Sequence, residues 1–153
     1  MGVSVWRGKF NRSSGEVVLD KAAGTGTLAV EVDVASIDFG QDALNAEMVK
    51  PAYLDAAGHP TARYVGRLAG FVDGKPTRVD GTFTLHGVTR PLALEIRSFK
   101  CMPHPIFKRD WCGADAHATF DRSAFGIDAG KEYGMDMDVA LRIQVEAVAK
   151  EDE

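Results

Sequence analysis

Apolar and polar residues alternate along most of this chain, a pattern typical of β-strands with one buried and one solvent-facing side. The alternation is clearest on either side of His86-Gly-Val-Thr89, where Gly87 can take the positive φ of a tight turn. Pro91 lacks an N–H and fits the first residue of a strand better than its middle. We therefore predict two strands, 77–85 and 92–99, joined by this turn. Their apolar positions are Val79, Phe83, Leu85, Leu92, Leu94 and Ile96.

Further strands are predicted wherever the same alternation returns. In 26–34 the apolar residues stand at 28, 30, 32 and 34, and acidic residues stand at 31 and 33. In 137–147 the apolar residues stand at 139, 141, 143 and 145. The other predicted strands are 5–10, 16–19 after a turn at Ser13-Ser-Gly15, 61–71 before a turn at Asp73-Gly74, and 113–120.

The alternation breaks once for a helix. Asp42–Val49 has Gln41 or Asp42 near its N-cap, Leu44 and Met48 on one face at i, i+4 spacing, and Pro51 to end it. About eight strands with one or two short helices and mostly short connections predict an all-β, antiparallel sheet that curls into a barrel. We expect a single domain over 1–149 and a solvated tail over 150–153.

Composition narrows the partners of this domain. The chain has 153 residues and a formal net charge of −4, and its Lys and Arg residues are scattered. Without a basic stripe, nucleic acid is not expected as a partner. No apolar run approaches the roughly 20 residues of a membrane-spanning helix, and the first residues as written lack the pattern of a signal peptide.

The predicted inward face offers space and little polarity. Strand 113–120 carries Ala114, Ala116 and Ala118 on its apolar side, and Gly66 and Gly81 fall on inward positions of other strands. A long apolar interior of this kind suits a lipid or hydrocarbon chain, whose binding scales with buried area. The alternative is that the alanines let the helix or a facing strand approach closely.

Two cysteines and one histidine form the only candidate reactive set. Cys101 and Cys112 are placed for a loop-closing disulfide that stabilises by about 3 kcal/mol, or for two free thiols in a reducing compartment. With His104 they offer three of the four ligands that zinc prefers, so a metal- or thiol-dependent redox enzyme is a further hypothesis. No nucleophile elbow, metalloprotease helix or phosphate-binding loop is present. We expect no catalysis, no cofactor and no metal.

Several segments together resemble the YceI-like family of polyisoprenoid-binding proteins, which have a lipocalin-like barrel. The likeness is carried by Gly81-Thr-Phe-Thr-Leu-His-Gly-Val-Thr-Arg-Pro91, by Phe120-Asp-Arg-Ser-Ala-Phe-Gly126, by 51–60, and by Ser36-Ile-Asp-Phe-Gly40. The segment from Cys101 to Ala116 looks like that of a bacterial subgroup. Nearly the whole chain is covered.

This resemblance implies that the barrel holds a long isoprenoid, such as a polyprenyl phosphate or an isoprenoid quinone, as a carrier or store. It also implies a periplasmic location. Relatives usually begin with a signal peptide and a further strand, so we expect the natural protein to have an upstream segment.

Arg122 is a candidate for an ion pair or for contact with the lipid headgroup, and His86 is a candidate for the barrel rim. The candidate ligand-binding residues are Leu28, Val30, Phe39, Leu44, Met48, Tyr64, Phe83, Leu85, Leu94, Ala116, Ala118, Arg122, Phe125, Leu141 and Ile143. The rival hypothesis is a structural or interaction module with a solid core that forms a homodimer and binds no lipid.

Overall fold

The structure is a computed structural model that describes residues 3–150. Its strands are β1 Lys9–Phe10, β2 Ser13–Asp20, β3 Thr25–Asp33, β4 Ile37–Asp38, β5 Thr61–Ala69, β6 Arg78–Leu85, β7 Val88–Pro91, β8 Leu94–Pro103, β9 Asp110–Asp121 and β10 Asp138–Val148. One α-helix, α1, spans Asp42–Met48, and 3-10 turns span Val34–Ser36, Arg122–Phe125 and Lys131–Tyr133. Residues 151–153 of the predicted tail lie outside the described residues.

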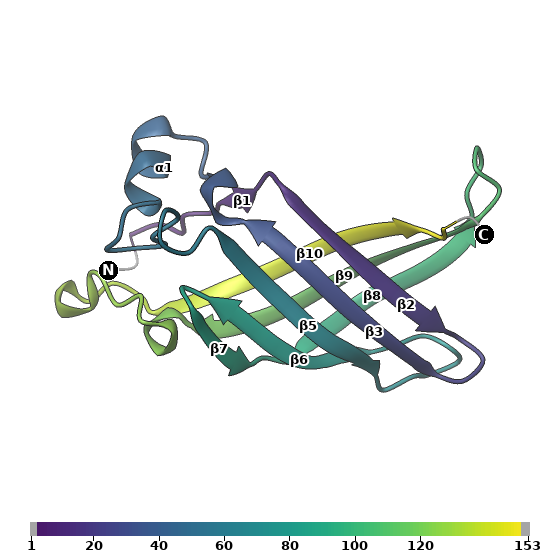
Figure 1. The fold of residues 1–153 in the computed structure, drawn as a ribbon. Coiled ribbons are helices and arrows are strands. Elements are labelled where there is room, and N and C mark those ends of the chain that lie inside the picture. Colours follow the sequence, from purple (N-terminus) through teal and green to yellow (C-terminus); the bar gives the residue numbers. More distant parts are fainter. Residues whose placement is uncertain (1–2, 151–153) are drawn as a thin grey trace.

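One large antiparallel sheet dominates the molecule, with the strand order β10-β9-β8-β6-β5-β3-β2 and with β7 paired to β6. The sheet curls into a half-barrel (Figure 1). The all-β, antiparallel, lipocalin-like prediction is therefore confirmed. Within residues 3–150, β2 and β10 do not pair with each other, so both are edge strands. Two ion pairs reach between the two sides of the sheet: Lys150 Nζ, after β10, contacts Glu16 Oε1 of β2 at 2.9 Å, and Lys21 Nζ, after β2, contacts Asp110 Oδ2 of β9 at 3.6 Å.

Both predicted turns are present, and the one after β6 is shorter than predicted. Asp73 and Gly74 have φ values of 52° and 76° between Val72 and Lys75, as predicted. The turn after β6 contains only His86 and Gly87, at 55° and 72°, because β7 starts at once at residue 88. Two successive positive φ values match the right-handed twist of a hairpin.

Two further details of this hairpin differ from the prediction. Pro91 is the last residue of β7 rather than the first of a new strand. Because β7 pairs only with β6, a residue without an N–H is tolerated there. Leu92 follows outside both strands, and its N–H donates to the carbonyl of Gly81.

The N-terminal strands were the least accurate part of the prediction. Ser13-Ser-Gly15 is not a turn, because it pairs with residues 30–32 as the start of β2. The predicted strand 5–10 is reduced to β1, which pairs with β4. Gly8 instead lies against the ring of Phe39, where an added Cβ would come within 2.6 Å of a ring carbon. At Gly8 the backbone packs against an aromatic ring and is not part of a strand ladder.

The helix prediction is confirmed, with Gln41 as the N-cap residue of α1. Its Asn45 side chain holds it to the sheet end: Oδ1 accepts from the Phe39 N–H at 2.7 Å and Nδ2 donates to Asp38 at 3.1 Å. No helix within residues 3–150 has the length and apolar character required to cross a membrane.

Candidate functional site: the inner face of the curled sheet

The register of the sheet brings apolar residues from six strands onto its concave side, which we call the inner face. Residues directly opposite each other in antiparallel strands point to the same side. Tyr64 stands opposite both Val30 and Phe83, and Ala116 stands opposite both Ile96 and Ile143. The inner face includes Leu28, Val30, Tyr64, Val79, Phe83, Leu85, Leu94, Ile96, Ala116, Ala118, Leu141 and Ile143, ten of which were predicted as ligand-binding and are brought together here.

Burial on the inner face falls from the centre toward the edges of the sheet. Val79 and Leu94 are 2% exposed, and Tyr64 and Ala116 are 7% exposed. Toward the edges, Leu28, Val30, Leu141 and Ile143 are only half-buried although they face the same side. Apolar side chains that stay partly accessible beside a buried core are a feature of binding surfaces.

The two inward glycines do not leave room for a ligand, contrary to the prediction. Gly66 and Gly81 stand opposite each other, and the side chain of Tyr64 fills the space above them. A Cβ at Gly81 would lie 2.4 Å from the carbonyl oxygen of Val65 and 2.7 Å from Tyr64 Oη. The Tyr64 hydroxyl donates to the carbonyl of Leu92 at 2.7 Å. The glycines therefore seat a buried tyrosine.

The alanines differ from the glycines in this respect. Ala114, Ala116 and Ala118 form the inner face of β9, between the longer side chains of β8 and β10. The half-buried Leu44 and Met48 of α1 belong to neither buried core cluster, so the helix does not pack onto the alanines. On the inner face, the side chains of these alanines are shorter than those of β8 and β10 on either side.

The burial of Tyr64 makes the stability of the fold depend on pH in the alkaline range. Desolvation first, and then the nearby Asp80 carboxylate, raise the pKa of Tyr64 to about 12. A pKa raised on folding favours the protonated form, so this contribution to stability is complete below pH ~10 and is lost as pH rises through ~12. We expect stability to fall over this window in the wild type and less so in Tyr64→Phe. Phenolate absorbance and chemical denaturation between these pH values measure it. Ionisation of all three tyrosines near pH 10 in the folded protein would contradict the prediction.

One end of the half-barrel is built by the two most recognisable sequence motifs. The His86 Nδ1–H donates to the Phe125 carbonyl at 3.1 Å, and Arg90 Nε donates to the Ala124 carbonyl at 2.7 Å. The rings of Phe83, Phe120 and Phe125 contact one another with centroids 5.3–5.4 Å apart. These contacts give His86 a structural part in joining the two motifs.

Four other candidate ligand-binding residues, Phe39, Leu44, Met48 and Phe125, lie outside the strands of the inner face. Phe125 is 3% exposed within the buried cluster that also contains Leu85. Leu54 and Ala56, which were not predicted, pack against that cluster. Phe39 lies under Gly8, so it faces the N-terminal segment.

Arg122 orders a loop instead of meeting a carboxylate. Its Nε donates to the Asp136 carbonyl at 3.1 Å, Nη1 to the Ile127 carbonyl at 3.0 Å, and Nη2 to the Ala129 carbonyl at 2.8 Å. The 3-10 turn that carries it begins at Asp121, whose Oδ1 accepts from both the N–H and the hydroxyl of Ser123. These two hydrogen bonds lower the pKa of Asp121.

A second cluster at this end was missed because its members are far apart in sequence. Asp55, His59 and His86 bring one potential metal-ligating atom each within 4.8 Å of one another. His59 Nε2 lies 3.9 Å from Asp55 Oδ2, and the rings of His59 and His86 have centroids 4.9 Å apart. Bonds of about 2.0–2.1 Å would require these side chains to draw together around an ion. The pattern could not be found from spacing alone.

At the opposite end, Cys101 and Cys112 form a disulfide between directly opposite residues of β8 and β9, with Cα atoms 4.0 Å apart. A zinc set with His104 would need these sulfurs as thiolates. The structure therefore favours the disulfide over the metal and free-thiol alternatives.

Comparison with known proteins gives consistent matches. A family model described as "YceI-like domain" matches residues 1–147. A UPF0312 protein of Pseudomonas putida strain W619 is 26% identical over 149 residues, covering 94% of this chain and 75% of that protein. A UPF0312 protein of Vibrio cholerae is 25% identical over 155 residues, covering 98% and 78%.

Solved structures show the same fold. A YceI protein of Campylobacter jejuni has a TM-score of 0.85 at 21% identity, covering 99% of this chain and 89% of that one. A polyisoprenoid-binding domain of Saccharophagus degradans, implicated in plant cell wall breakdown, has a TM-score of 0.62 at 18% identity, covering 94% and 85%.

Proposed function

Because this chain belongs to the YceI-like family, we propose that its inner face binds the hydrocarbon tail of an isoprenoid lipid. The ligand would be a polyprenyl phosphate or an isoprenoid quinone, and the protein would be a carrier or a store for it without catalysing a reaction. The observation that carries the proposal is the apolar inner face, which stays partly uncovered toward its two sides, at Leu28 and Val30 and at Leu141 and Ile143. The description of the Saccharophagus neighbour as polyisoprenoid-binding supports it.

The physical argument rests on area. A prenyl chain has no hydrogen-bonding groups, so it binds where apolar area can be buried and polar groups are already satisfied. Within residues 3–150, no buried side-chain nitrogen or oxygen lacks a hydrogen-bond partner. The tail would lie along the alanines of β9, between the side chains of β8 and β10.

We also propose a periplasmic location. A disulfide between Cys101 and Cys112 persists in an oxidising compartment, whereas cytosolic thiols are generally kept reduced. Measuring the oxidation state of the two cysteines in separated cell fractions of the natural source tests this.

Native mass spectrometry of the protein purified gently from its natural source tests the main proposal. We expect a complex whose excess mass is that of an extractable isoprenoid. A lipid-free monomer from a membrane-rich source would contradict it. A lipid-free dimer would favour the interaction module, for which the edge strands β2 and β10 are the available surface.

Replacing Arg122 separates tail binding from headgroup binding. The guanidinium of Arg122 donates hydrogen bonds from three different nitrogens to three carbonyls, and the single ammonium of a lysine cannot reproduce them. Arg122→Lys is therefore expected to destabilise the fold by about 1–3 kcal/mol. We expect it to weaken binding of a polyprenyl phosphate and of a neutral quinone equally. Denaturant unfolding and titration with both lipids measure these effects. A loss confined to the phosphate would show that Arg122 contacts the headgroup.

A further inference from the structure

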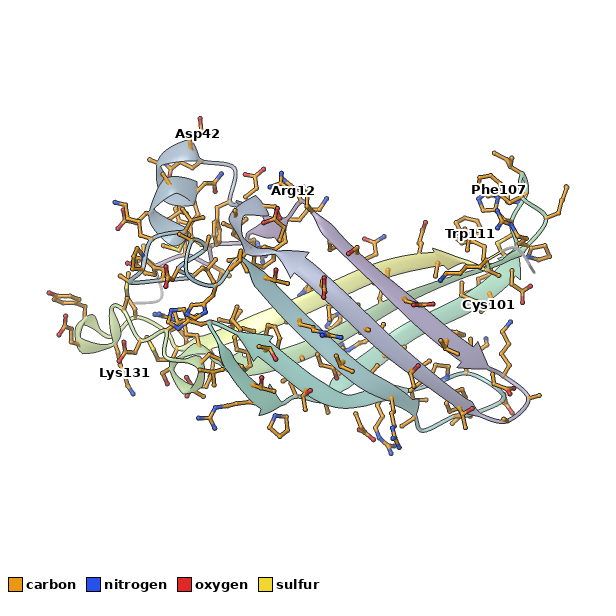
Figure 2. The ribbon with its side chains drawn as sticks, viewed as in Figure 1. Arg12, Asp42, Cys101, Phe107, Trp111 and Lys131 are labelled. Atoms are coloured by element: carbon orange, nitrogen blue, oxygen red, sulfur yellow. A yellow bond between two sulfur atoms is a disulfide. The ribbon has the colours of Figure 1, made fainter. Side chains whose placement is uncertain are left out.

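The hairpin between β8 and β9 ends in a tip, residues 102–109, that no core contact explains. It projects from the sheet at the end opposite α1, where Figure 2 labels Phe107. Ile106 is 77% exposed, Phe107 53% and Met102 44%. None of the three belongs to or packs against either buried cluster. Folding therefore gains little from these apolar side chains.

The tip is held in one shape. The disulfide between Cys101 and Cys112 closes its base. Inside it, the His104 N–H donates to the Arg109 carbonyl at 2.8 Å, and His104 Nδ1 accepts from the N–H groups of Ile106 and Phe107, both at 3.2 Å. The His104 ring also stacks on Phe107 at 4.6 Å between centroids. An ordered loop presents its apolar residues without a large further entropy cost on binding.

Cations surround these residues, although the chain as a whole is acidic. Lys108 lies within the tip and Lys100 just before it, and the Arg109 guanidinium carbon lies 5.3 Å from the Phe107 ring centroid. The neighbouring Asp110 carboxylate is paired with Lys21. Apolar side chains at an apex with Lys and Arg around them match the chemistry of an anionic lipid surface, which attracts the cations and receives the apolar groups.

We propose that the tip docks the protein on an anionic membrane by inserting Ile106 and Phe107 among the lipid headgroups and acyl chains. The proposal extends the proposed function, because it supplies the place where an isoprenoid would leave or enter the bilayer. The inner face begins at the same hairpin: Phe99 stands opposite Ala114, next to the disulfide. Strands β8 and β9 thus lead from the tip to the candidate lipid-binding surface.

Co-sedimentation with vesicles tests the docking. The full chain is mixed with vesicles of phosphatidylcholine alone or with phosphatidylglycerol, at low and high salt. We expect binding to the anionic vesicles that weakens with salt. Ile106→Asp is expected to reduce partitioning at least tenfold. Lys108→Asn, chosen because Asn tolerates the φ of 56° at this position, is expected to reduce it about fivefold.

Val72→Asp is the matched control, because Val72 is 61% exposed in a different hairpin. Equal partitioning of Ile106→Asp and Val72→Asp would overturn the proposal, as would equal binding of the wild type to neutral and anionic vesicles. Native mass spectrometry of the same variants distinguishes the two hypotheses. Ile106→Asp should lose docking but keep a bound lipid, whereas docking by a protein that never carries lipid would contradict the proposed function and leave the tip proposal standing.

Discussion

Replacing Ile143 by aspartate is expected to weaken binding of an isoprenoid lipid at least about 100-fold while leaving the protein folded. Ile143 is half-buried on the inner face, opposite Ala116. The substitution removes apolar contact area and places a carboxylate that a hydrocarbon tail would cut off from water without a partner. Because solvent reaches this position in the unliganded protein, the carboxylate can stay hydrated there. Titration with a fluorescent prenyl lipid measures the affinity, and thermal unfolding checks the fold.

The matched control for this change is Gln144→Asp, which adds the same side chain to the exposed outer face of β10. We expect it to bind lipid with the wild-type affinity. Similar losses in the two variants would mean that charge on β10, and not its inner face, affects binding. Wild-type affinity in Ile143→Asp would place the lipid elsewhere and contradict the site.

Replacing Gly81 by alanine is expected to destabilise the fold by about 3 kcal/mol or more. The added Cβ would lie 2.4 Å from the Val65 carbonyl oxygen, 2.8 Å from the Cα of Gly66 and 2.7 Å from Tyr64 Oη. Two of these atoms are backbone atoms of the neighbouring strand and cannot move without breaking its ladder. Overpacking of a close-packed interior typically costs about 1–3 kcal/mol, and contact with backbone puts this case at the upper end. Denaturant unfolding gives the value.

Gly113→Ala is the control, because the nearest atoms to an added Cβ there lie 3.7 Å away. Gly113 is also in a strand, so alanine should be neutral or stabilise by about 0.4–1 kcal/mol through the unfolded chain. Similar stabilities for the two variants would show that there is room for a methyl group above the glycines of β5 and β6. That result would contradict the conclusion that the Tyr64 side chain fills this space.

Much of the fold could be predicted because period-two alternation records which side of a strand is buried. The strands at 26–34, 61–71, 113–120 and 137–147, the helix at 42–49 and the turn at Asp73-Gly74 follow from that pattern and from local backbone preferences. The alternation misleads where a bulge intervenes. Between Ile96 and Ser98 the register of β8 shifts by one residue, so that Phe99 continues the face of Ile96.

The candidate site was predictable to a smaller extent. Register assembles the predicted inner-face residues, and their contact with a lipid stays a prediction. Two cases show why the sequence is not sufficient. A glycine indicates space but not which neighbour fills it, and Tyr64 fills the space above Gly66 and Gly81. A cationic side chain does not reveal its partner, and the guanidinium of Arg122 donates to three loop carbonyls.

The sequence by itself determined the class of sheet, the apolar character of its inward side, the family resemblance and the position of two cysteines near a hairpin, because these depend on local periodicity and on motifs. Only the tertiary structure decided that β2 and β10 do not pair with each other within residues 3–150, that the two motifs meet through His86 and Phe125, and that the β8–β9 tip presents Ile106 to solvent. These are contacts and exposures between distant segments, and their energies depend on the geometry that brings the segments together.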